Sequence, residues 1–268
     1  MKTLSLLLCI SFIFLSSASP ITNPTNLTAR SPPQIPTHER RGIAYNNAKL
    51  LSLFAQPGSH ITWRYNWDSS TASSPTIFDF TPMLHSVRSD HTKVWKTNVE
   101  AVVQKNWEKG RATWVLGFNE PDDCMYPLAA SNRNVYLGSP AVTNARATDT
   151  SGPGWLARFL RECTGCTSVD FVNIHWYGVA NVHSFKAYID ATRKVAQGRP
   201  IWITEFKPEG TVEQIRRFLE EAMPWMDESP DVHRYAYFMA TPGEGFLVDG
   251  NGGALSEIGR TFAFFHRH

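Results

Sequence analysis

Short apolar segments and longer amphipathic stretches alternate along the chain from Gly42 onward. Segments rich in Val, Ile, Trp, Tyr and Phe predict eight strands, at residues 42–45, 62–67, 78–84, 113–119, 136–141, 171–177, 200–206 and 234–240. Stretches with apolar residues at helical spacing predict helices at residues 93–107, 155–162, 185–195, 212–225 and 257–265. Strands and helices therefore follow one another repeatedly.

This alternation predicts a fold of the α/β class. Strands that each lead into a helix form parallel sheets with right-handed crossovers, and eight of them suit a (β/α)8 TIM barrel of roughly 250 residues. The 227 residues from Gly42 to the C-terminus give about 28 per unit, near the roughly 30 of a βαβ repeat. An open doubly wound sheet is the alternative, but no glycine-rich phosphate loop follows a predicted strand. We expect a single-domain barrel over residues 42–268.

The N-terminal segment differs in composition from the rest of the chain. A positive Lys2, an apolar run over residues 4–15 and small residues at 16–19 predict a secretory signal peptide over residues 1–19. The apolar run is shorter than the roughly 20 residues of a membrane span. Residues 20–41 are rich in Pro, Ser, Thr and Asn and predict a disordered pro-segment. We therefore expect a secreted protein without a membrane anchor.

The pro-segment carries two processing signals. Asn26 begins the only N-glycosylation sequon. Arg40 and Arg41 resemble a dibasic site for secretory proteases, and cleavage there would place the mature N-terminus at Gly42. Two solvated arginines in a tail are the alternative interpretation of the same residues.

Composition and charge narrow the class of partner. With 42% hydrophobic and 19% charged residues, the chain has the composition of a globular protein. Without residues 1–41 it has 22 basic and 23 acidic side chains, so the net charge falls from +2 to −1. A near-neutral domain without basic runs is a poor candidate for binding nucleic acid or anionic membranes. We expect an uncharged or weakly charged ligand and a monomeric protein.

Three cysteines remain in the expected mature protein, in an oxidising compartment. Cys163 and Cys166 could close a short, strained loop, or Cys124 could pair with either of them. No second CxxC or nearby His pair completes a zinc site, and no other residues have the spacing of metal ligands. We therefore expect the protein to act without a metal or cofactor.

Two of the predicted strand ends carry glutamates. Glu120 follows the strand at 113–119, and Glu205 lies near the end of the strand at 200–206. Chemistry in a (β/α)8 barrel takes place at the C-terminal ends of the strands, and the 85 residues between the glutamates span three repeat units. We therefore expect the two carboxylates to converge from opposing sides of the barrel mouth. Such a pair suits glycoside hydrolysis, with one proton donor and one nucleophile or base.

An ordered set of motifs carries a family resemblance. The motifs are YNW at 65–67, GFNEPD at 117–122, SPAV at 139–142, the run 170–178 with HWY at 175–177, and WITEF at 202–206. Together they resemble the fungal cell-wall glycosyl hydrolases of glycoside hydrolase family 128, along nearly the whole chain from Gly42. The resemblance implies a retaining barrel glycosidase that acts mainly on β-1,3-glucans, with Glu120 as acid/base and Glu205 as nucleophile. It also implies that Asn119 binds the sugar 2-hydroxyl, with a strand-end cap as the alternative role.

Other strand ends supply candidate binding residues. His175 and Tyr177 are two residues apart and share one face of their strand. The Tyr177 phenol could hold Glu205 ionised, and His175 could bond the sugar or groups behind it. Trp67 at the end of the second strand is the candidate sugar platform, and we expect the adjacent Asn66 to bind substrate with it. Packing in the barrel core is the alternative for the aromatic and histidine side chains.

Three further tryptophans on predicted strands are expected in the core. Trp176 alternates away from the face of His175 and Tyr177, so it should pack under a helix. Trp114 and Trp202 are expected to belong to the core.

These features predict a secreted, cell-wall-associated retaining endo-β-1,3-glucanase that cuts internal bonds by double displacement. Glu120 must hold a proton for this reaction, so we expect burial and the charge of Glu205 to raise its pKa. One alternative is the same machinery acting on β-1,6-glucan, mixed-linkage glucan or mannan. Another is a wall protein that binds glucan without cleaving it, although binding alone does not need two opposed acids.

Overall fold

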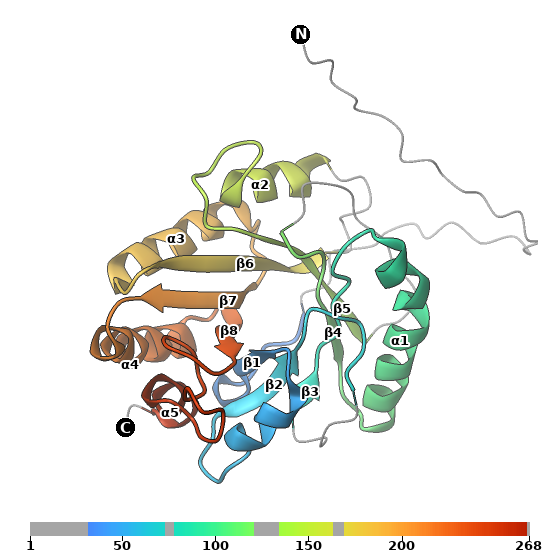
Figure 1. Ribbon diagram of the computed structural model, residues 1–268. Coiled ribbons are helices and arrows are strands. Elements are labelled where there is room, and N and C mark those ends of the chain that lie inside the picture. Colours follow the sequence, from blue (N-terminus) through green and yellow to red (C-terminus); the bar gives the residue numbers. More distant parts are fainter. Residues whose placement is uncertain (1–31, 73–77, 121–133, 163–168, 267–268) are drawn as a thin grey trace, which may run out of the picture.

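A computed structural model describes residues 32–72, 78–120, 134–162 and 169–266. Its single sheet has the strand order β3-β2-β1-β8-β7-β6-β5-β4, and every neighbouring pair is parallel (Figure 1). The strands are β1 Arg41–Tyr45, β2 Ile61–Tyr65, β3 Asp79–Phe80, β4 Thr113–Val115, β5 Val135–Val142, β6 Val169–Val179, β7 Ile201–Glu209 and β8 Val232–Ala240.

The sheet closes on itself between its two outer strands. A parallel bridge joins Met83, just after β3, to Leu116, just after β4, and the Leu84 amide donates to the Leu116 carbonyl at 3.2 Å. Each predicted strand overlaps one strand of this curled sheet. The expected single-domain (β/α)8 barrel is therefore confirmed.

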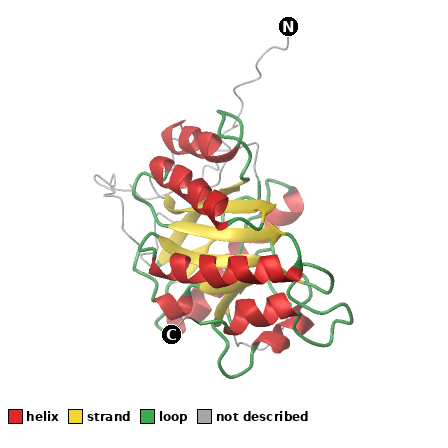
Figure 2. Cartoon of the chain, turned by 90° about the vertical axis from the view of Figure 1, so that its left-hand side faces the viewer, coloured by secondary structure: helices red, strands yellow, loops and turns green. Residues whose placement is uncertain are grey.

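Helices surround the strands, as Figure 2 shows. The α-helices are α1 Ser89–Glu108, α2 Gly152–Glu162, α3 Val182–Val195, α4 Val212–Glu228 and α5 Glu257–Phe264, and each matches a predicted helix. Two 3-10 helices, η1 Thr37–Glu39 and η2 Ala48–Phe54, precede and follow β1. In the described ranges, no helix is long and apolar enough to cross a membrane.

Aromatic side chains fill the lower part of the barrel. The ring of Trp202 lies 4.3 Å from Phe171, 5.2 Å from Trp114 and 5.4 Å from Trp63, measured between centroids. The buried guanidinium of Arg234 lies 4.9 Å from the Trp202 ring. The core positions expected for Trp114 and Trp202 are confirmed. Because this aromatic cluster fills the barrel interior, a pocket can form only at the C-terminal ends of the strands.

The outer face of β6 packs under helices, as expected. Trp176 stacks on Phe218 of α4 at 5.4 Å and meets Phe185 of α3 edge-on at 5.0 Å. Alternation along β6 therefore sends Trp176 outward and leaves its neighbours His175 and Tyr177 for the barrel side.

The structure describes residues 32–41 of the predicted pro-segment, and the last two of them are folded into the domain. Arg41 is the first residue of β1, and Arg40 and Arg41 are 6% and 4% exposed. Arg40 Nη1 donates to the carbonyls of Met226 and Ser229 at 3.0 and 2.8 Å, around the end of α4. These arginines are therefore part of the folded domain, and a protease could not reach the bond after Arg41 in the folded protein.

Arg41 connects the start of the chain to its last helix. Its guanidinium donates to the carbonyls of Phe262 and Phe265 at 2.9 and 3.0 Å and pairs with Asp227 at 3.4 Å. Carbonyls at helix C-termini carry partial negative charge that favours a cation. The composition of residues 20–41 predicted disorder, because composition does not show contacts with residues nearly 200 positions away in the sequence. Asn26 and the cysteines lie outside the described residues.

We predict that the chain beginning at Gly42 is less stable than the chain beginning at Pro20. The shorter chain leaves Asp227 without its buried cation and several helix-end carbonyls without donors, which costs about 3 kcal/mol or more. The melting temperature should fall by about 10 °C, as measured by circular dichroism. Arg41→Met in the longer chain should reproduce part of the loss, whereas equal melting temperatures for all three proteins would contradict the assignment.

Candidate active site

The C-terminal ends of the strands surround a cavity of about 500 Å³. Residues from the ends of β1, β2, β4, β6, β7 and β8 and the segment after β3 contribute to its wall. They are Asn46, Trp67, His85, Asn119, Glu120, Tyr177, Glu205, Phe238 and Met239. The cavity therefore lies where a barrel of this type carries out chemistry, and both predicted glutamates line it.

Glu205 lies on β7 with only 4% of the residue exposed. Trp67 Nε1 donates to its Oε1 at 2.7 Å, and the Tyr177 hydroxyl donates to its Oε2. Burial and the negative charge of Glu205 raise the pKa of Tyr177 far above its usual value, so the phenol keeps its proton and remains a donor. Two donors, one from the loop after β2 and one from β6, thus orient this carboxylate within the cavity.

Glu120 is placed differently. It follows β4 with a φ of 43°, in the left-handed region, and 43% of its side chain is exposed. Its Oε1 lies 3.1 Å from Nδ1 of His175. That hydrogen bond lowers the pKa of Glu120 by more than partial burial raises it. The expectation of a raised pKa is therefore wrong for the substrate-free protein, because the side chain is half open to water and meets a donor.

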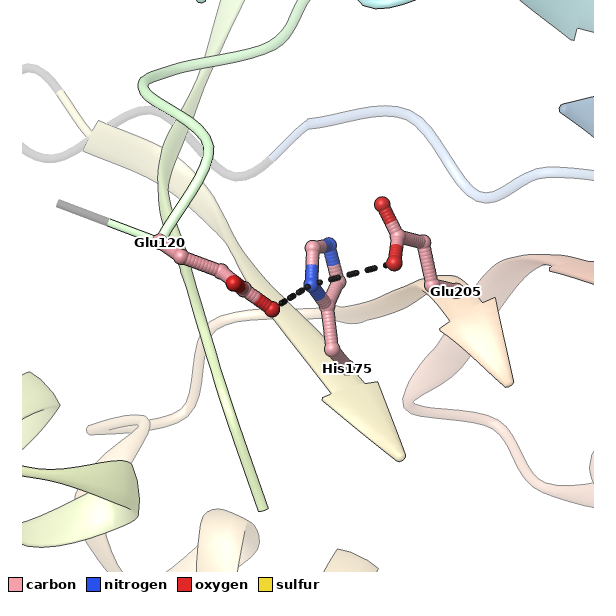
Figure 3. A group of neighbouring side chains, drawn as sticks. All are labelled: Glu120, His175 and Glu205. Atoms are coloured by element: carbon pink, nitrogen blue, oxygen red, sulfur yellow. Dashed lines mark hydrogen bonds and ion pairs between the residues drawn. The ribbon is translucent and has the colours of Figure 1, made fainter. Parts of the chain in front are cut away.

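His175 lies between the two glutamates (Figure 3). Its Nδ1 is 3.1 Å from Glu120 Oε1 and 3.5 Å from Glu205 Oε2, and the residue is fully buried on β6. Because both neighbours are carboxylate oxygens, we assign a proton to Nδ1. One N–H therefore serves two possible acceptors, and it links the two carboxylates that the sequence singled out.

The gap between the carboxylates bears on the stereochemistry. One oxygen of Glu120, one of Glu205 and Nδ1 of His175 all lie within 4.8 Å of one another. Retaining glycosidases have carboxyl groups about 5 to 5.5 Å apart, whereas inverting ones need about 6.5 to 9.5 Å to admit a water between them. The nearest oxygens of the two glutamates are therefore closer than the separation expected of an inverting pair.

The same three side chains have the composition of a metal site. A cation here would have to displace the Nδ1–H that faces both carboxylates, and it would compete with the Trp67 and Tyr177 donors on Glu205. The pattern is that of a carboxylate held by hydrogen-bond donors, and it fits a metal ligand set less well.

The remaining predicted residues separate into two groups. Asn119 lines the cavity, and its buried Oδ1 has no partner among the described residues, so it is a free acceptor for a ligand hydroxyl. Asn66 does not line it. The Asn66 amide donates to the Ser70 carbonyl at 2.9 Å and accepts from the Asp68 amide at 3.3 Å, so it organises the loop after β2.

Four cavity residues were not predicted. Asn46 and His85 directly follow the first and third predicted strands, so the strand-end criterion applied to Glu120 would also have found them. Phe238 and Met239 lie inside an apolar strand and carried no signal that separates them from the core.

Comparison with known proteins places this geometry in a family. The model of the glycosyl hydrolase catalytic core matches residues 42–262. The chain belongs to this family. A crystal structure of a family 128, subgroup III, curdlan-specific exo-β-1,3-glucanase from Blastomyces gilchristii, with glucose bound, is 31% identical. The match covers 86% of this chain and all of that one, with a TM-score of 0.71. The predicted resemblance to glycoside hydrolase family 128 is confirmed.

Two further relatives extend the comparison. A family 128, subgroup IV, endo-β-1,3-glucanase from Lentinula edodes has the same fold at 24% identity, with a TM-score of 0.67 and coverage of 84% and 99% of the two chains. Alkali-sensitive linkage protein 1 of Schizosaccharomyces pombe is 28% identical over 257 residues. That alignment covers 83% of this chain but 44% of the relative, so the chain spans less than half of that protein.

We predict that His175→Phe raises the pKa of Glu120. The change removes the hydrogen bond that lowers this pKa. It also leaves the Glu120 carboxyl close to the charge of Glu205, in a cavity wall that has become less polar. A 13C NMR titration of the glutamate carboxyls, assigned with Glu120→Gln, measures the shift. His183→Phe, at an exposed histidine of α3, is the control and should leave the titration unchanged; an unchanged value in His175→Phe would refute the role of its Nδ1.

Proposed function

We propose that this protein is a retaining β-1,3-glucanase, with Glu205 as nucleophile and Glu120 as acid/base. The observation that carries the proposal is the pair of carboxylates within 4.8 Å at the barrel mouth, one buried among donors and one half exposed. The relative at 31% identity is a β-1,3-glucanase, which supports the choice of glucan. A near-neutral domain with a free amide acceptor in its cavity suits an uncharged polysaccharide.

The first step joins the glucan to the enzyme. Glu205 attacks the anomeric carbon and forms a glycosyl ester while the bond to the glycosidic oxygen breaks, and Glu120 gives its proton to that oxygen. In the second step Glu120 takes a proton from water, whose oxygen attacks the same carbon and releases Glu205 as a carboxylate. Two inversions at one carbon retain its configuration.

The shared N–H of His175 fits both steps. Before the reaction, a bound glucan covers Glu120 and excludes water, which raises the pKa of that carboxyl. The Nδ1–H then favours the charged Glu205, 3.5 Å away. Once Glu205 is esterified it carries no charge, so the N–H returns to Glu120 and stabilises it as the base. The substrate-free geometry corresponds to this second arrangement.

The mode of cleavage is part of the proposal. We propose internal cleavage of the glucan chain, as expected from the sequence. The alternative is release of sugars from a chain end, which the exo-acting Blastomyces relative favours. Secretion and association with a cell wall remain predictions based on the N-terminal segment and on the family resemblance.

We predict that residues 20–268 hydrolyse laminarin and curdlan and leave pustulan, barley glucan and mannan uncut. Glu120→Gln and Glu205→Gln should each lower the rate about 1,000-fold or more, because each removes a member of one catalytic unit. Glu209→Gln changes an exposed glutamate of the same strand β7 and should retain wild-type activity. Reducing-end assays give the rates, and product sizes separate internal from terminal cleavage.

The stereochemistry gives a separate test. Proton NMR of the first product should show the β-anomer. An α-anomer would overturn the retaining mechanism while leaving hydrolysis intact. A wild-type protein that binds a glucan tightly and releases no reducing ends over a day would instead establish the binding function.

A further inference from the structure

The loop after β2 holds an aromatic residue in an unusual conformation. Trp67 has a φ of 58°, in the left-handed region that side chains other than glycine rarely adopt. Such a conformation is unfavourable for a side chain other than glycine and persists only where the surroundings determine it. The position of the Trp67 side chain is therefore a feature that the rest of the fold maintains.

The left-handed conformation coincides with a contact to the nucleophile. The indole Nε1 of Trp67 donates to Oε1 of Glu205 at 2.7 Å, across 138 residues of sequence. The ring is fixed on two sides, because it lies 5.0 Å from Tyr65 and meets Phe238 edge-on at 5.7 Å. The direction of the N–H is thus set by packing against β2 and β8.

Hydrogen bonds within the loop after β2, and from the loop to neighbouring segments, hold this loop in place. Asn66 bonds both the Ser70 carbonyl and the Asp68 amide, and the Asp68 carbonyl accepts from the Met83 amide at 3.0 Å. Asn98 of α1 donates to the Ser69 hydroxyl at 2.8 Å. The loop is therefore connected to the segment after β3 and to α1, which keeps Trp67 in place.

We propose that Trp67 is a positioning residue that orients the Glu205 carboxylate, and that Asn66 acts through it. This inference rests on the proposed function and replaces the expected role of Trp67 as a sugar platform. An uncharged donor holds one oxygen without adding a cation that would weaken the nucleophile. It also stabilises the carboxylate that leaves in the second step, when the ester is cleaved.

Other groups face the same carboxylate and define what the Trp67 contact adds. Tyr177 and His175 approach from β6, Glu120 from the end of β4 and Tyr65 from β2. Trp67 is the donor to Oε1 among the described residues, whereas Oε2 has the Tyr177 hydroxyl. The nearby Tyr65 hydroxyl donates to the Thr204 carbonyl at 2.8 Å, so loss of the indole N–H removes the donor that Oε1 has in this structure.

The test is Trp67→Phe, which keeps an aromatic ring and removes the N–H. The acid limb of the pH profile of kcat/KM on laminarin should move up by about one unit, because the ionised nucleophile loses a hydrogen bond. The value of kcat should fall about tenfold or more, with glycosyl-enzyme accumulating in a burst on an aryl glucoside, while KM does not rise. Asn66→Ala should shift the same limb in the same direction by less.

Trp107→Phe is the matched control, since Trp107 is a tryptophan of α1 that is 59% exposed, and its profile should equal that of the wild type. A sugar platform predicts the opposite pattern: Trp67→Phe would retain the wild-type pH profile, and Trp67→Ala would only raise KM. That result would overturn the proposal.

A crystal structure without substrate separates this inference from the proposed function. The Glu205 carboxylate of Trp67→Phe should turn away from its direction in the wild type, whether or not any glucan is cut. An unchanged direction of that carboxylate would overturn the positioning role even in an active glucanase.

Discussion

A buried carboxylate at the mouth of an aromatic barrel is the constraint on which the rest of the site depends. Removing a charged carboxylate from water is costly unless hydrogen-bond donors replace the lost hydration. Glu205 is 4% exposed, and its donors come from the loop after β2 and from β6. The neighbouring strands and the left-handed conformation of Trp67 can be understood as the means of supplying those donors at fixed angles.

The second glutamate has the opposite environment, and the difference suits its role. Glu120 is half exposed and hydrogen-bonded to a histidine that also faces Glu205. In the proposed mechanism the nucleophile needs a fixed direction and the acid/base group needs to exchange a proton, which fits one packed and one open carboxylate. Because one N–H of His175 serves both, the charge on one carboxylate affects the protonation of the other.

The contacts that stabilise the domain and the residues of the candidate active site lie at opposite ends of the barrel. At the lower end, Trp63, Trp114 and Trp202 surround the guanidinium of Arg234. Arg40 and Arg41 connect the first strand to the carbonyls that end α4 and α5. These contacts hold the two ends of the domain together and leave the upper ends of the strands available for polar residues that do not improve packing.

The sequence alone determined the barrel, its single domain and the two glutamates, because strand and helix periodicity and the polar residues at strand ends are local properties of the chain. It also determined that Trp176 faces a helix, since alternation decides that. Tertiary structure decided the rest. The burial of Arg41, the donor role of Trp67 and the place of His175 between two carboxylates depend on partners 55 to 224 residues away. No local pattern encodes such distant pairings, and the pKa of Glu120 follows from one of them.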